Sequence, residues 1–193
     1  MASGNSVDPP DANRVPLSGA TLIVGPSGAG KTRLTARTLE NWLDVNGARD
    51  VVVLEFGPSI EHEGRLVGGR LDRFVDVPDA VFHGVLDAKA PRLEGDSAAA
   101  TRELARQNAE RATRIFDALP SDPAAVFVND ATIPFQHESA DVTRLTRYAD
   151  RATCAVVNAY EGESLDVGDD VSNRERDVLG SLREWADRVV SLG

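Results

Sequence analysis

Cysteine and lysine are nearly absent from this chain of 193 residues. Cys154 is the only cysteine, so no internal disulfide can form, and a reducing compartment, the cytoplasm, is the expected location. It lies in the apolar run 152–157, where a buried structural thiol is expected rather than a nucleophile. Lysine occurs only as Lys31 and Lys89 among 21 basic residues, so arginine is used almost everywhere else.

Long apolar runs are missing as well. No stretch approaches the roughly 18 consecutive apolar residues of a membrane-spanning helix, so no membrane span is expected. The first residues have neither the basic nor the apolar region of a secretory signal. Residues 1–16 are predicted to form a disordered tail because they are rich in Pro, Ser, Asn and Asp. Residues 17–193 are enough for a single domain with one core.

The charge balance is acidic, with 31 Asp and Glu against 21 Lys and Arg and a net charge of −10. Scarce lysine, abundant Asp and few aromatic residues are typical of proteins adapted to high salt, although a high-GC genome produces part of the same bias. Such a surface argues against a broad nucleic-acid footprint or an anionic membrane partner, while leaving room for a local basic patch.

One stretch of the chain meets the phosphate-binding pattern G-x-x-x-x-G-K-[ST] at every required position. It consists of Gly25, Pro26, Ser27, Gly28, Ala29, Gly30, Lys31 and Thr32. The glycines let successive N–H groups point at phosphate oxygens, and the following helix adds the positive end of its dipole. Lys31 is expected to reach the β- and γ-phosphates, and the Thr32 hydroxyl to hold Mg²⁺. A guanidinium cannot replace this compact ammonium, so a rare lysine at this position strengthens the prediction.

Apolar runs and amphipathic stretches alternate along the chain. This alternation predicts a three-layer α/β fold, with a mainly parallel central sheet and helices on both faces. Strands are expected at 20–24, 51–54, 124–128, 153–157 and 188–192. Helices are expected from Thr32 to about Asn46, over 97–119, over 139–148, and from a capping box at 172–175.

Residues 57–97 have a different composition, rich in Gly, Pro and charged residues. We expect a lid or a specificity insertion here, with short strands at 73–77 and 81–85. Its arginines, Arg65, Arg70 and Arg73, could supply charge to a transferring phosphate, or could simply be solvated partners of surface carboxylates.

Asp130 and Glu55 are the candidate catalytic carboxylates. Asp130 follows the apolar strand 124–128, and a carboxylate there can order a Mg²⁺-bound water at the carboxyl edge of the sheet. Glu55 ends the strand that follows the first helix, from which it could position or deprotonate an attacking water. Ala131 follows Asp130, so the Asp-Glu pair of many ATPases is absent, and either Glu55 replaces it or hydrolysis is slow.

Asn158 is expected to end the strand at 153–157 and to contact the terminal phosphate. The stretch 158–161 shares only its Asn with the guanine-reading motif N-K-x-D, because Ala159 and Glu161 replace the Lys and the Asp. ATP is therefore expected as the nucleotide rather than GTP.

The stretch 25–32 resembles the P-loop NTPase superfamily. Together with 17–24, with 51–55 and with 126–130, it is similar to the RecA/KaiC-like ATPases. In that class a glutamate ends the strand after the first helix, and an aspartate ends a later strand. The resemblance implies MgATP bound at the carboxyl edge of the sheet, and often a ring or filament of identical subunits. No DNA-binding loops are recognisable.

Three functions remain open. The first is a Mg²⁺-dependent ATPase or nucleotide-driven switch, with an unidentified protein partner and with segment 57–97 moving as the nucleotide changes. The second is a small-molecule kinase, in which that segment binds the phosphate acceptor. The third is a regulatory nucleotide-binding protein that hydrolyses little.

Overall fold

A computed structural model describes residues 15–193 except 59, 63–64, 68 and 163–169. The tail predicted for residues 1–16 therefore lies almost entirely outside the described part of the chain. Six strands form the main sheet, and a separate two-stranded hairpin lies beside it. The main strands are β1 (Gly19–Gly25), β2 (Val51–Glu55), β5 (Phe82–Val85), β6 (Ala125–Asn129), β7 (Cys154–Tyr160) and β8 (Arg188–Ser191).

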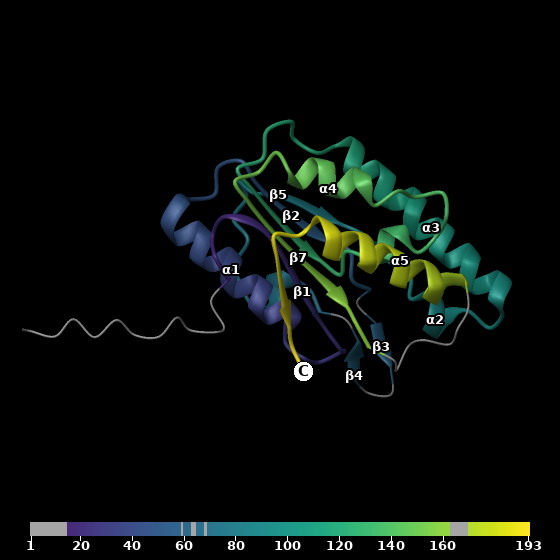
Figure 1. Ribbon diagram of the computed structural model, residues 1–193. Helices are drawn as coiled ribbons and strands as arrows, with labels where there is room; N and C mark the ends of the chain where they lie inside the picture. Colours follow the sequence, from purple (N-terminus) through teal and green to yellow (C-terminus); the bar gives the residue numbers. More distant parts are fainter. Residues whose placement is uncertain (1–14, 59, 63–64, 68, 163–169) are drawn as a thin grey trace, which may run out of the picture.

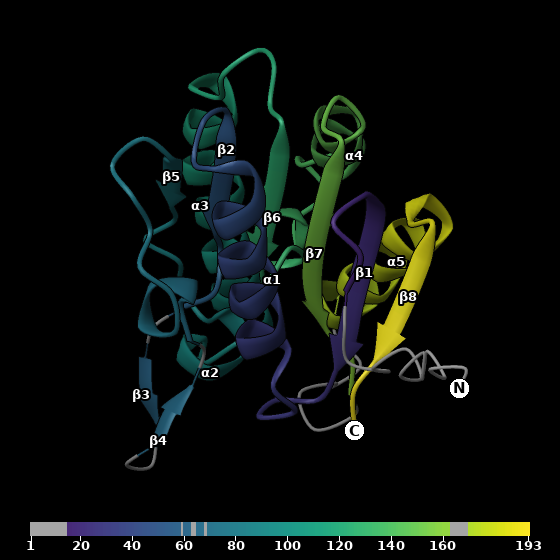
Figure 2. The ribbon, with the colours of Figure 1, turned by 90° about the vertical axis from the view of Figure 1, so that its left-hand side faces the viewer.

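All neighbouring strands of the main sheet run parallel, in the order β5-β2-β6-β7-β1-β8 (Figure 2). Helix α1 (Lys31–Asn46) covers one face, and α3 (Ala98–Asp117), α4 (Thr143–Ala149) and α5 (Asp170–Trp185) cover the other (Figures 1 and 2). The predicted three-layer α/β fold is thereby confirmed. Because all strands are parallel, their carboxyl ends meet at a single edge of the sheet.

Alternating residues of each strand fill the two layers between the sheet and its helices. On β2, Val51 and Val53 pack on the α1 side with Leu39, whereas Val52 and Leu54 belong to the other layer. Strand β6 repeats this division, with Phe127 on the α1 side. Both faces of the sheet are thus buried, and the strands read as continuous apolar runs for that reason.

Segment 57–97 differs most from the sequence prediction. Its β5 is an edge strand of the main sheet, close to the strand expected at 81–85. The strand expected at 73–77 is wrong, because the chain forms the short helix η1 (Leu71–Arg73) followed by a turn. A hairpin of β3 (Ile60–His62) and β4 (Arg65–Val67) and the one-turn helix α2 (Pro91–Glu94) complete the segment.

Two other boundaries differ for a physical reason. Strand β7 continues to Tyr160 because it pairs with β1 along its whole length, as far as Gly25. Helix α5 begins at Asp170, so the capping box predicted at 172–175 is wrong. Glu175 faces the interior instead, where it accepts hydrogen bonds from the side chains of Thr132 and Gln136.

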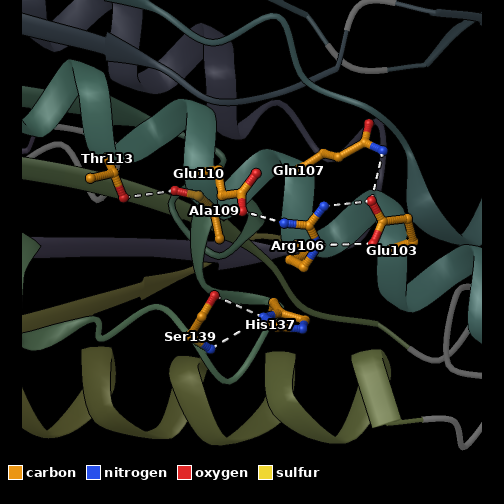
Figure 3. Close-up of polar contacts among 8 residues, drawn as sticks. All are labelled: Glu103, Arg106, Gln107, Ala109, Glu110, Thr113, His137 and Ser139. Atoms are coloured by element: carbon orange, nitrogen blue, oxygen red, sulfur yellow. Dashed lines mark hydrogen bonds and ion pairs between the residues drawn. The ribbon is translucent and has the colours of Figure 1, made fainter.

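The outer face of α3 carries a row of polar contacts (Figure 3). The Arg106 guanidinium forms ion pairs with Glu103 and Glu110, one turn before and one turn after it. Close to this row, His137 Nδ1 lies 2.8 Å from Ser139 Oγ and accepts a hydrogen bond from the Ser139 backbone N–H. These residues therefore form a surface network, and His137 contributes to the turn before α4.

Across the described residues, we find no helix with both the length and the apolarity that a membrane crossing demands.

Two residues of α1 provide a test of how the layers are packed. Leu39 is fully buried, whereas Val45 is 73% exposed. Leu39→Ala should lower the free energy of unfolding by about 2–5 kcal/mol, because it removes buried methyl groups and leaves a cavity. Val45→Ala, the control in the same helix, should change it by less than about 0.5 kcal/mol. Chemical denaturation measures both, and equal losses would contradict the described burial of α1.

Candidate functional site

A cavity of about 720 Å³ lies at the carboxyl edge of the sheet. The loop between β1 and α1 forms one part of the wall, and residues after β2 and β6 and the last residue of β7 form others. Segment 69–74, α2 and α5 contribute as well. Its lining includes Ser27, Gly28, Gly30, Lys31, Thr32, Arg73, Phe74, Arg92, Asp130, Thr132, Gln136, Tyr160 and Glu175. A cavity of this size suits a nucleotide-sized ligand.

The loop between β1 and α1 has the backbone of an anion cradle. Gly28 and Gly30 have φ of 81° and 93°, a left-handed conformation that side chains disfavour. Helix α1 starts directly afterwards, and its first turn has no side-chain cap and no acidic residue. Its first N–H groups and the positive end of its dipole therefore remain available to an anion.

Lys31 is the cation of this cradle. Its side chain is buried, and its Nζ donates a hydrogen bond to the Pro26 carbonyl at 2.8 Å. Burial lowers the pKa of Lys31, and the charge of Asp130 opposes that effect. Lys31 Nζ also lies 5.9 Å from the centre of the Tyr160 ring. The ammonium is thus held inside the loop that the sequence motif predicted.

Thr32, one of the two predicted magnesium ligands, contacts Asn129. Its hydroxyl donates to Asn129 Oδ1 at 3.1 Å, and Asn129 Nδ2 donates to the Gly69 carbonyl at 2.6 Å. Asn129 is the last residue of β6, one position before Asp130. Asn129 therefore holds the loop at Gly69 and supports Thr32 from behind the cavity, and its contact with Thr32 is one that no local motif marks.

Asn158 requires a correction. It was expected to end a strand and contact the phosphate, but it lies within β7, is fully buried and does not line the cavity. Its Nδ2 donates to Thr35 Oγ1 at 2.9 Å and to Asn129 Oδ1 at 3.0 Å, and its Oδ1 accepts from the Asp130 N–H. Asn158 therefore acts as a buried support behind the site.

Glu55 also lies outside the cavity lining. Its Oε1 accepts a hydrogen bond from the Leu71 N–H at 2.6 Å, and His83 Nε2 lies 3.8 Å away. Residues of η1 cover the end of β2, so the carboxylate is fully buried behind Leu71. The prediction that Glu55 faces a terminal phosphate is corrected accordingly, because its observed position fixes segment 69–71 instead.

Asp130 lines the cavity and is only half-buried. Burial raises the pKa of Asp130 to about 6, the Lys31 charge counteracts this, and the carboxylates of Glu175 and Glu55 add to it. Gly57 lies directly behind the carboxylate, because a Cβ there would come 2.3 Å from Asp130 Oδ2. Asp130 is thus the predicted carboxylate that reaches the cavity.

The cavity lining contains a buried ion pair that sequence reasoning did not find. Arg92 Nη1 lies 2.5 Å from Glu175 Oε2. Glu175 Oε1 accepts from Thr132 Oγ1 at 2.7 Å and from Gln136 Nε2 at 3.1 Å. Gln136 Oε1, also buried, has no hydrogen-bond partner among the described residues. No local motif marks these residues, because they come from three separate elements.

The remaining predicted residues divide as follows. Ser27 and Gly28 line the cavity, whereas Gly25, Pro26 and Ala29 do not. Of the three insertion arginines, Arg73 lines the cavity and is exposed, and Arg70 pairs with Asp72 at 2.7 Å. The side chain of Arg65 lies outside the described part.

A magnesium ion would find suitable groups here. Mg²⁺ in phosphate sites needs one or two protein oxygens and takes the rest of its shell from phosphate and water. The Thr32 hydroxyl and the Asp130 carboxylate line the same cavity, so they fit this need. Within the described residues, no group of three or more His, Cys, Asp or Glu side chains could hold a metal without such a ligand.

No protein-family model matches the sequence, and a search of curated proteins finds no match.

The raised pKa of Asp130 predicts a pH-dependent effect of Asp130→Asn. Because the native pKa is about 6 and the reference value is 3.8, the native carboxyl binds its proton more tightly, and ionisation destabilises the fold as pH rises from about 4 to 6. Asparagine has no such ionisation and tolerates the left-handed backbone of residue 130, where φ is 56°.

At pH 7 the variant should gain up to about 3 kcal/mol in free energy of unfolding, and the gain should vanish below about pH 4. Urea denaturation at constant ionic strength measures this, with Asp79→Asn at an exposed position as the control. A gain that is the same at pH 4 and pH 7 would contradict the assigned cause.

Proposed function

We propose that this protein binds a nucleoside triphosphate with Mg²⁺ in the cavity at the carboxyl edge, and that it acts as an ATPase or nucleotide-driven switch. The observation that carries the proposal is the loop 25–32, which combines a left-handed glycine backbone, an uncapped helix start and a buried lysine. Each of the three favours an anion, and together they match the requirements of a polyphosphate.

Within this proposal each residue has a distinct task. The N–H groups of the loop and of the first turn of α1 bind the phosphate oxygens, and Lys31 neutralises the outer phosphates. Thr32 and Asp130 are the residues that would hold Mg²⁺, which supplies charge neutralisation between the phosphates when bound. Asn129 accepts the Thr32 hydrogen, which leaves a lone pair of the hydroxyl oxygen directed elsewhere.

The position of Glu55 bears on hydrolysis. Because Glu55 is buried outside the cavity lining, the carboxylates of described residues that line the cavity are Asp130 and Glu175. Glu175 already accepts three polar partners. Asp130 is therefore the cavity carboxylate that remains to orient an attacking water. If Asp130 must both hold Mg²⁺ and orient the attacking water, ATP hydrolysis is expected to be slow. Slow hydrolysis is suited to a nucleotide-driven switch.

A kinase remains the second candidate because of the extent of the cavity. The cavity extends from the loop 25–32 to α2 and α5, and its lining includes the apolar residues Leu93 and Ile133. A small phosphate acceptor would have contacts there. Free phosphate and phosphorylated small molecules, separated after incubation with γ-labelled ATP and a metabolite extract, distinguish hydrolysis from transfer.

The two lysines of the chain allow a matched test of nucleotide binding. Lys31→Ala should weaken MgATP binding at least about 100-fold, because a buried charge-assisted contact to the phosphates is lost. Lys89→Ala removes the same group outside the cavity lining and should leave affinity unchanged. Isothermal titration with MgATP and MgGTP at low and multimolar KCl, with phosphate release on the same samples, measures both steps. Equal behaviour of the two variants would contradict the proposal.

A further inference from the structure

We propose that Arg92 binds the terminal phosphate of the nucleotide, so that this chain itself provides the group that distinguishes a triphosphate from a diphosphate. The inference rests on the proposed function. It assigns to Arg92 a ligand contact that the sequence motif does not contain, and to Glu175 the role of its partner when no terminal phosphate is present.

Arg92 lines the same cavity as residues of the loop 25–32. Its side chain is 10% exposed, and Arg92 lines the cavity. Its Cζ lies 5.8 Å from the centre of the Tyr160 ring, and Lys31 Nζ lies 5.9 Å from the same point. These two distances limit the separation of the cationic groups to their sum, 11.7 Å. Because both residues also line the same cavity, the terminal phosphate of a nucleotide bound at Lys31 is the group that we assign to Arg92.

The charges that line the cavity support an exchange in which Arg92 turns from Glu175 to a terminal phosphate. Four described cationic residues line the cavity: Lys31, Arg33, Arg73 and Arg92. Of these, Arg92 pairs with the buried carboxylate of Glu175, and Lys31 lies near Asp130. Asp130 and Glu175 line the same cavity as these cations, so their charges act on one space. A terminal phosphate introduces further negative charge, to which the guanidinium fork can bind while it keeps a contact with Glu175.

Other hydrogen-bond donors beside Glu175 keep its buried carboxylate partnered if Arg92 turns away. Thr132 Oγ1 and Gln136 Nε2 donate to Glu175 Oε1, so the carboxylate keeps two partners when Arg92 turns part of its fork toward a phosphate. Glu175 also belongs to α5, whereas Arg92 belongs to α2. Nucleotide state would therefore change the contact between two elements that are far apart in sequence.

The test compares two variants that differ only at position 92. Glu175→Gln removes the carboxylate charge but keeps an oxygen for Thr132 and Gln136, and the double variant Arg92→Met/Glu175→Gln also removes the guanidinium. Neither leaves an unpaired buried carboxylate. Affinities for MgADP and for the magnesium complex of a non-hydrolysable β,γ-imido ATP analogue are measured by isothermal titration on the full chain.

Glu175→Gln should bind the imido triphosphate severalfold more tightly than the wild type does, because Arg92 is released from its carboxylate. The double variant should bind it at least about tenfold more weakly than Glu175→Gln, with MgADP affinity changed less than about twofold. Arg92→Lys should recover only part of the loss, because an ammonium lacks the fork.

Arg144→Met is the matched control. Arg144 also pairs with a carboxylate, Asp117 at 2.5 Å, and lies 5.2 Å from the centre of the Phe116 ring, but it lies outside the cavity lining. It should bind both nucleotides like the wild type. Circular dichroism melting of each variant separates loss of the fold from loss of the contact.

Equal affinities of the two Glu175 variants for the triphosphate analogue, or an equal fall for both nucleotides, would overturn the role of Arg92 while leaving nucleotide binding intact. A wild-type protein that binds neither nucleotide would overturn the proposed function, and this inference with it.

Discussion

The side-chain amide of Asn129 holds together the elements that surround the cavity. Its oxygen accepts hydrogen bonds from Thr32 at the start of α1 and from Asn158 within β7, and its nitrogen donates to Gly69 before η1. Asn129 is fully buried, so a bond lost here would leave a polar group without water, at a cost of about 1–3 kcal/mol. The phosphate loop, two central strands and segment 69–71 are therefore fixed in one arrangement.

Acidic residues outnumber basic ones in this chain, and several of the basic residues line the cavity. Lys31 comes from the loop after β1 and Arg92 from α2, and each lies beside a carboxylate, Asp130 or Glu175. Buried ion pairs contribute little net stability because both charges lose their hydration. Their presence here is better explained by the need for cations that an anionic ligand can reach, with carboxylates that keep those cations in place until it arrives.

The fold and the place of the turn between β1 and α1 could be predicted because their signals are local: buried parallel strands are continuous apolar runs, and the loop motif has a fixed spacing. The rest of the site depends on contacts between distant residues. The contact of Thr32 with Asn129 joins two residues that are far apart in the chain. The backbone N–H of Leu71 in η1, a helix that the sequence did not predict, binds the Glu55 carboxylate and keeps it out of the cavity lining. Arg92 of α2 reaches Glu175 of α5 only because the two helices come together in the fold.

Parallel pairing has a consequence for the order in which the molecule assembles. Strand β1 has no partner close to it in sequence, because Gly19 pairs with Cys154 and Thr21 pairs with Arg188. The strand that leads into the phosphate loop therefore gains its neighbours only after β7 and β8 have been synthesised. Long-range parallel pairing is slow, since the loop-closure entropy is lost before the contacts form. The loop 25–32 is therefore encoded early in the chain, but the strand that leads into it finds its neighbours late in folding.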